Sequence, residues 1–110
     1  MRLLQEEEKS FAEIMRNSIR EGLGGVIGKS GMEAVYINFK LNDCLMNPKA
    51  THASLLPAFK DHGSEILEKA VMKELYRKIN ERYEPDLPFS YEALFHKARK
   101  LFVGKQIKDR

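Results

Sequence analysis

The sequence GLGGVIGKSG at residues 22–31 decides the fold, because it ends like a phosphate-binding loop. Such a loop requires a glycine, four further residues and then Gly-Lys-Ser or Gly-Lys-Thr. Residues 28–30 fit the end of this pattern, but the position of the first glycine is occupied by Leu23. A phosphate-binding loop also follows a buried strand, whereas residues 15–21 have helical spacing. We therefore interpret the glycines as a connection between two helices.

The residues on either side of the glycines predict two helices. Apolar residues recur every three or four positions before them, which is the period of one helix face. We expect this first helix to run from about residue 3 to residues 22–26, where the glycines end it. Ser30 and Glu33 then form a capping box, in which each side chain bonds the backbone of the other. A second helix follows and ends near residues 41–43.

A short third helix is expected after a break at residues 47–48. Either Thr51 or Ser54 can cap it, since both side chains carry a hydroxyl acceptor. Pro57 is tolerable only in the first turn of a helix, so the third helix is short or begins late.

Two more helices complete the prediction. Residues 61–64 turn the chain into a fourth helix over about residues 64–82. Its apolar face repeats every four residues: Leu67, Val71, Leu75 and Ile79. Two prolines within residues 84–88 end it, and Ser90 caps a fifth helix that weakens at Gly104. The apolar face of the fifth helix comprises Tyr91, Leu94, Phe95, Ala98, Leu101 and Phe102.

These patterns predict an all-α, compact bundle of about five helices that forms a single domain over residues 1–110. The chain contains 43% apolar and 32% charged residues, which is typical of a globular protein. Residues 26–83 are expected to form the best-defined core. Residues 84–88 are a proline linker, and residues 89–105 are a C-terminal basic amphipathic helix.

Composition also bears on the compartment. No apolar run approaches the roughly 20 residues that a membrane-spanning helix needs. The N-terminal residues are acidic and lack the apolar core of a secretory signal. Cys44 is the single cysteine, so it cannot form an internal disulfide. We therefore expect a cytoplasmic protein.

The residues that could support catalysis or metal binding are few. Cys44, His52, His62 and His96 are the only cysteine and histidines, and they lack the close pairing of zinc ligands. The acids at the start of the fourth helix, Glu68 among them, are explained by the helix dipole. We therefore expect no catalytic residue, no metal and no cofactor. An enzyme would instead show a ligand-sized pocket with converging titratable groups.

The last helix carries the sharpest functional signal. Residues 93–108 contain five basic side chains and no acid: Lys97, Arg99, Lys100, Lys105 and Lys108. Such a face can contact an anion or a nucleic acid. It can equally serve as a solvated face, with cations at the negative end of the helix dipole. The net charge of +3 does not decide between these alternatives.

The abundance of apolar faces predicts a non-catalytic interaction or regulatory module that binds a protein partner or itself. Phe89, Tyr91, Phe95 and Phe102 are many aromatics for so short a chain to cover, which favours a homodimer. The alternative is that the linker folds the last helix back and covers them.

Residues 28–36 (GKSGMEAVY) and 59–76 (FKDHGSEILEKAVMKELY) resemble an archaeal family of small helical domains, the Nitrosopumilus-type output domain. The shared features are a glycine-serine-glycine opening to an aromatic-bearing helix, a Phe–Gly turn, and an Ile-x-Glu-Lys helix that ends near Leu-Tyr. The resemblance covers about residues 26–80. It implies an all-α fold and attachment to signalling proteins, and it implies no catalytic residue.

Overall fold

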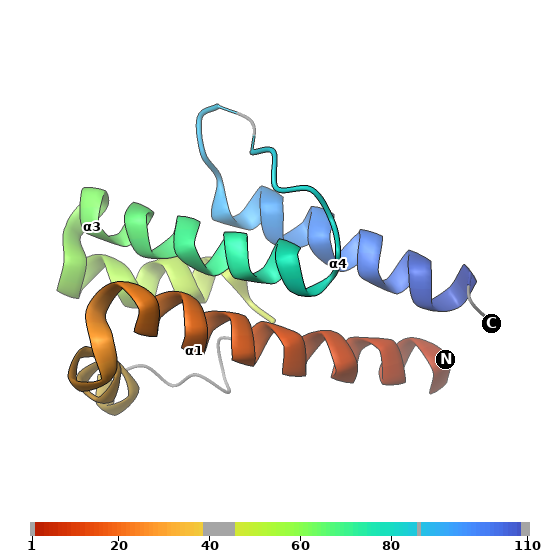
Figure 1. Cartoon of the computed structure of the whole chain (residues 1–110), viewed down its shortest axis with the longest axis horizontal. Coiled ribbons are helices and arrows are strands. Elements are labelled where there is room, and N and C mark those ends of the chain that lie inside the picture. The colour runs from red at the N-terminus through yellow and green to blue at the C-terminus, as the bar shows by residue number, and fades with distance from the viewer. Residues whose placement is uncertain (1, 39–45, 86, 109–110) are drawn as a thin grey trace.

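In the computed structural model, the described residues include the helices α1 (Arg2–Asn38), α3 (Pro48–Lys78) and α4 (Tyr91–Lys108) (Figure 1). The structure describes residues 2–38, 46–85 and 87–108. These residues include no strand, so the predicted all-helical class is confirmed. None of their helices is both long and apolar enough to cross a bilayer. The three helices pack against one another in a single body of 42 × 30 × 21 Å.

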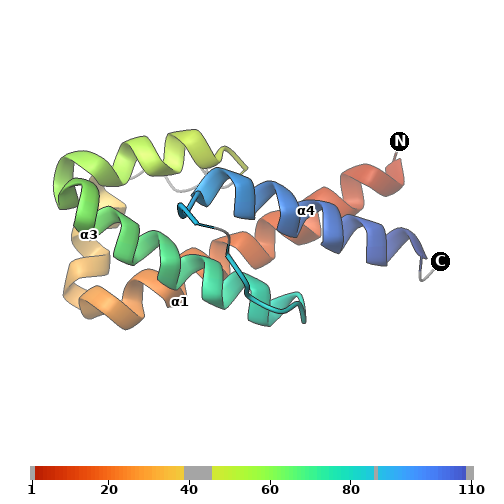
Figure 2. The ribbon, with the colours of Figure 1, turned by 90° about the horizontal axis from the view of Figure 1, so that it is seen from above.

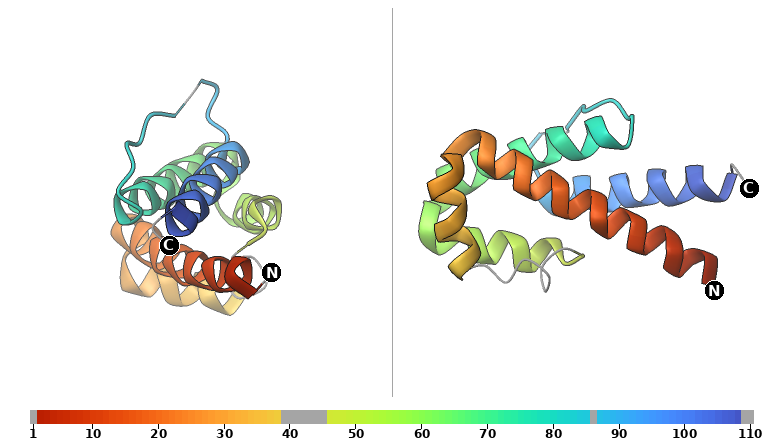
Figure 3. Two further views of the ribbon diagram at one scale, coloured as in Figure 1. Left: turned by 90° about the vertical axis from the view of Figure 1, so that its right-hand side faces the viewer. Right: turned by 60° about the horizontal axis from the view of Figure 1, so that its bottom comes forward.

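Two of the helices are bent, and the bends correct the expected count of about five helices. α1 turns at Gly28 (φ 76°, ψ 176°), and α3 turns at Lys60 (φ 62°, ψ 179°). Helical structure resumes directly after each turn, so the predicted connections at residues 22–31 and 61–64 are bends and not loops. Both bends lie at the same end of the bundle (Figure 3). We refer to residues 48–59 and 61–78 as the first and second arms of α3.

The glycines of α1 have roles that differ from the predicted one. Gly22, Gly24 and Gly25 lie within the helix and do not end it, so the expected end at residues 22–26 is wrong. At Gly22 an added Cβ would lie 2.7 Å from the Cα of Val71, so the backbones of α1 and α3 approach closely there. Among the glycines of α1, only Gly28 has a positive φ, which a residue without a Cβ adopts readily.

The cap of α3 also differs from the prediction. Asn47, and neither Thr51 nor Ser54, caps the helix: its side-chain oxygen accepts from the backbone N–H of Ala50 at 3.1 Å. Pro48 takes the first position, where a missing N–H does no harm. The first arm ends at the bend at Lys60, so the expected short helix before residues 61–64 is confirmed. Residue 57 lies well beyond the first turn of this arm, so the expectation that Pro57 is tolerable only in a first turn is wrong.

α4 begins as predicted and extends further than predicted. The Ser90 hydroxyl accepts from the backbone N–H of Ala93 at 3.2 Å, which confirms it as the cap. The helix continues past Gly104 to Lys108. The connection from α3 rises clear of the bundle before the chain returns to α4 (Figure 1). α4 thus lies back on the other two helices, which is the alternative that covers its aromatic face.

The core draws on all three helices and extends beyond residues 26–83 on both sides. The Phe11 ring meets the rings of Phe95 and Phe102, with centroids 5.6 and 5.7 Å apart. The Tyr76 hydroxyl donates to the Leu94 carbonyl at 2.8 Å, and burial raises the pKa of Tyr76 to about 12. The buried apolar side chains are Phe11, Met15, Ile19, Leu23, Leu67, Val71, Met72, Leu75, Tyr76, Ile79, Tyr91, Leu94, Phe95, Ala98 and Phe102. The predicted apolar faces of residues 64–82 and of α4 are therefore confirmed in the main.

Candidate ligand-binding cleft

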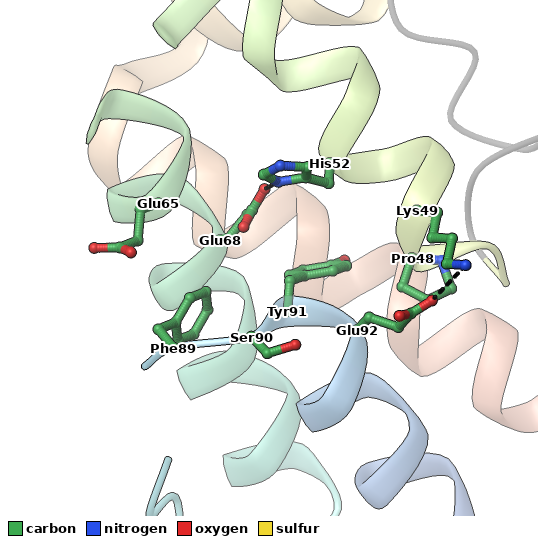
Figure 4. A pocket seen from close by; sticks show the side chains of 9 residues that line it. All are labelled: Pro48, Lys49, His52, Glu65, Glu68, Phe89, Ser90, Tyr91 and Glu92. Atoms are coloured by element: carbon green, nitrogen blue, oxygen red, sulfur yellow. Dashed lines mark hydrogen bonds and ion pairs between the residues drawn. The ribbon is translucent and has the colours of Figure 1, made fainter. Parts of the chain in front are cut away.

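A cleft of about 410 Å³ lies where the two arms of α3 meet the start of α4. Its walls combine polar and apolar groups that come from three separate stretches of the chain. Figure 4 shows side chains from the two arms of α3 and from α4 around the cleft, with His52, Glu68 and Tyr91 close together and Glu65 pointing away from them. The fold brings them together because α3 reverses at Lys60 (Figure 2), which sets its first arm beside its second. The lining residues are Pro48, Lys49, His52, Glu65, Glu68, Phe89, Ser90, Tyr91 and Glu92.

The centre of the cleft is a hydrogen bond between the two arms. Nδ1 of His52 lies 2.5 Å from Oε2 of Glu68, within hydrogen-bond distance. The Glu68 side chain is 3% exposed, whereas that of His52 is 49% exposed. The buried carboxylate therefore orients a ring that remains open to solvent.

Burial dominates the electrostatics of Glu68. Removal from water disfavours its charged form and raises the pKa of the Glu68 carboxyl, and the neighbouring Glu65 raises it further. The hydrogen bond from His52 and the attraction to its ring work in the opposite direction. The net shift is upward, so Glu68 holds a proton more readily than an exposed glutamate does.

The other polar groups of the cleft have intramolecular partners. Lys49 lies 3.8 Å from Glu92, and Glu65 lies 3.3 Å from Lys69. Ser90 is occupied as the cap of α4. Pairs as exposed as these contribute little to stability, so a ligand can compete for them at small cost.

Two aromatic rings supply the apolar part of the lining. Tyr91 is buried at the base of the cleft, and Phe89 flanks it. The ammonium of Lys69 lies 5.6 Å from the centroid of the Phe89 ring, within the range of a cation–π contact. This side of the cleft therefore already accepts a positive charge from the protein itself.

Four of the five predicted anion contacts have side chains that the structure describes, and these four differ in their surroundings. Lys97 and Lys100 are exposed on α4. Arg99 pairs with Glu8 of α1, and Lys105 donates to the Ile79 carbonyl at 3.2 Å and pairs with Glu81 at 2.5 Å. Lys105 thereby binds the C-terminal end of α3, where the helix dipole favours a cation. The side chain of Lys108 lies outside the described residues.

The remaining cysteine and histidines are dispersed. His62 and His96 are exposed on different helices, and Cys44 lies outside the described residues. Over the described part of the chain, no group of three or more His, Cys, Asp and Glu side chains is arranged to hold a metal ion.

Sequence reasoning missed the His52–Glu68 pair, although one signal for it was present. Glu68 falls on the face of Leu67, Val71 and Leu75, so helical spacing places an acid at an inward position. An acid there requires a buried partner. The helix dipole alone therefore does not explain the acid at position 68. The identity of the partner depends on the bend at Lys60, which is not evident from spacing.

Comparisons with family models, with curated proteins and with solved structures found no match to this chain.

Proposed function

We propose that the protein is a non-catalytic helical binding module with a regulatory role, and that its ligand site is the cleft at His52 and Glu68. The observation that carries the proposal is the convergence of a buried carboxylate, a half-exposed imidazole and two aromatic rings on one cleft of about 410 Å³. Ligand sites combine apolar walls with a few polar groups in this way.

The contacts within the cleft favour binding over catalysis. Among the described lining residues, the Ser90 hydroxyl is held by the backbone of α4 and is not hydrogen-bonded to His52. A nucleophile activated by a base needs that contact. His52 and Glu68 are therefore best suited to orienting a ligand.

The charges of the lining indicate the kind of ligand. The lining includes three carboxylates, those of Glu65, Glu68 and Glu92, with one lysine and one histidine. The Glu65 carboxylate pairs with Lys69 and points away from His52 (Figure 4), so Glu68 and Glu92 are the acids that a ligand would meet. A ligand with an ammonium group and an apolar ring would meet the acids with its charge and the aromatic side chains with its ring.

The experiment is a titration of the ¹⁵N-labelled protein with benzylammonium, followed by the amide signals in two-dimensional NMR spectra. Phenylacetate, which has a similar ring and the opposite charge, is the matched control ligand. We expect benzylammonium to shift the amides of His52, Glu68 and Tyr91. Glu68→Gln should weaken this binding, whereas Glu13→Gln, at an exposed site on α1, should not. Equal shifts of the His52, Glu68 and Tyr91 amides with both ligands would contradict the proposal.

The regulatory role rests on the resemblance to the Nitrosopumilus-type output domain, which implies attachment to signalling proteins. Self-association is a separate part of the proposal. Its support is the set of exposed large apolar side chains, Val26, Met46, Ile66 and Leu87. Light scattering should give a dimer mass that falls on dilution, and a constant monomer mass at high concentration would exclude the homodimer.

Nucleic-acid binding is the second candidate function, because Lys97 and Lys100 are exposed on the same helix. Contacts to phosphates release counterions, so the affinity should fall steeply as salt increases. A gel-shift titration with double- and single-stranded DNA and RNA tests it. Absence of a complex at low salt would exclude this function.

A further inference from the structure

A second cavity, of about 640 Å³, lies between the N-terminal half of α1 and α4. It shares no lining residue with the cleft at His52 and Glu68, and its charge has the opposite sign. Basic side chains reach it from both helices, with Lys9 on α1 and His96 and Arg99 on α4. Glu8 is the one acid in its lining.

Arg99 has donor capacity to spare. One guanidinium nitrogen, Nη2, bonds the carboxylate of Glu8, and the side chain as a whole is 41% exposed. The Nε–H is buried and has no hydrogen-bond partner among the residues that the structure describes. A guanidinium carries five N–H donors in a fixed plane that matches a carboxylate. A second carboxylate could therefore bind beside Glu8 or displace it.

The apolar part of the lining comes from Met46, Ala12 and Phe95. Met46 is 36% exposed and is one of the few large apolar side chains open to solvent. Methionine is flexible and polarizable, so it adapts to ligands of different shape. The cavity thus combines a cationic edge with an apolar wall.

We propose that this cavity binds a small organic anion, namely a carboxylate attached to an apolar ring or chain. Arg99 and Lys9 bind the carboxylate, and Met46 and Phe95 contact the apolar body. The inference is independent of the function proposed for the cleft, because the two sites have different residues and opposite charge.

The NMR titrations with benzylammonium and phenylacetate also test this proposal, and here phenylacetate is the ligand expected to bind. Phenylacetate should shift the amides of Lys9, Ala12, His96 and Arg99, whereas benzylammonium should leave them in place. Acetate, which lacks the ring, should bind more weakly than phenylacetate. Shifts at the cleft and none at this cavity would overturn the inference and leave the proposed function intact. Shifts at this cavity and none at the cleft would support the inference and contradict the proposed function.

Substitutions assign the binding to particular side chains. Lys9→Gln should weaken phenylacetate binding roughly two- to fivefold, as expected for a solvent-exposed charge. Arg99→Gln should weaken it further, and Glu8→Gln should strengthen it by removing the competing carboxylate. Lys97→Gln removes a charge from the same helix outside the cavity and is the matched control. Lys9 is exposed, so its variant keeps the test valid if Arg99→Gln unfolds the protein.

The result that contradicts the proposal is equally specific. Lys9→Gln could leave phenylacetate binding unchanged, or Lys97→Gln could weaken it to the same extent. Either result would show that phenylacetate is attracted by the net charge of the protein and does not bind at a defined site. Absence of shifts at millimolar phenylacetate would also overturn it.

Discussion

The bends at Gly28 and Lys60 have nearly the same backbone geometry but very different residues. Both have φ between 62° and 76° and ψ between 176° and 179°, a region that is essentially limited to glycine. α1 meets this requirement with a glycine. α3 meets it with a lysine, whose Cβ makes the conformation unfavourable by about 1–3 kcal/mol. The first bend is therefore compatible with its own sequence, whereas the second must be held by its surroundings.

The surroundings of the second bend are the contacts that join the two arms of α3 to the rest of the protein. His52 of the first arm bonds the buried Glu68 of the second arm. The pair of Lys49 and Glu92 is exposed and adds little to this link. These contacts also form the candidate cleft. The strained bend and the candidate cleft therefore share the link between the two arms of α3, and backbone strain often clusters at functional sites.

The largest expected effect concerns a glycine that does not lie at a bend. Gly22→Ala should lower the free energy of unfolding by about 3 kcal/mol, because the new Cβ would overlap the backbone of Val71 and force α1 away from α3. Gly25→Ala is the control: it lies in the same helix with open space around it, and should raise stability by about 0.5–1 kcal/mol. Denaturant unfolding measures both. Equal effects would show that close packing at Gly22 is unimportant.

Gly28→Ala should introduce at the first bend the backbone strain that Lys60 causes at the second bend. We expect a loss of about 2 kcal/mol, because alanine at φ 76° is strained although no atom lies within 4 Å of the added Cβ. The loss is therefore a backbone effect, and denaturant unfolding against the wild type measures it. An unchanged stability would mean that the bend at Gly28 is not fixed in solution.

Lys60→Gly is the reverse substitution and should stabilise the protein by about 1 kcal/mol. Relief of backbone strain exceeds the entropy that a glycine adds to the unfolded chain. Lys73→Gly, at an exposed position within the second arm, is the matched control and should destabilise by about 1 kcal/mol. Thermal and denaturant unfolding of the two variants give the comparison. Destabilisation by both would contradict the strain assigned to Lys60.

The smallest effect is the pH dependence of the link between the arms. Burial raises the pKa of Glu68, so the folded protein binds this proton more tightly than the unfolded chain does. Stability from this group is present below its ordinary pKa and is lost as pH rises through the raised value. Glu68→Gln keeps an acceptor for His52 and cannot titrate. The free energy of unfolding of Glu68→Gln should therefore increase relative to that of the wild type as pH rises above 4.5, the ordinary pKa of a glutamate.

Unfolding free energies of both proteins across that range provide the measurement, and Glu13→Gln serves as the exposed control. A constant difference between Glu68→Gln and the wild type would show that Glu68 does not change its protonation on folding in this range.

Local signals in the sequence carried much of the fold. The spacing of Leu67, Val71 and Leu75 predicted a helix with a buried face, and Ser90 predicted the start of α4. The missing glycine at position 23 and the helical residues before it argued against a nucleotide-binding loop. All of these signals depend on residues a few positions apart, so the chemistry of a single helix is sufficient to predict the structure there.

Local spacing does not indicate which group each residue contacts in the folded chain. The glycines of α1 look alike in sequence, yet Gly22 lies against Val71 and Gly28 forms a bend. The basic residues of α4 follow one another closely, yet Arg99 and Lys105 bond groups on α1 and after α3. Pairing of this kind joins residues that are distant in the chain, so no local spacing indicates it.

By itself, then, the sequence determined that the chain is helical and which faces of its helices are buried, because hydrophobic period and capping act within one or two turns. Only the tertiary structure decided where the helices bend, how closely α1 and α3 approach, and that His52 meets Glu68 at a cleft. Those features arise from backbone strain and packing between distant segments, and they exist only once the helices have packed together.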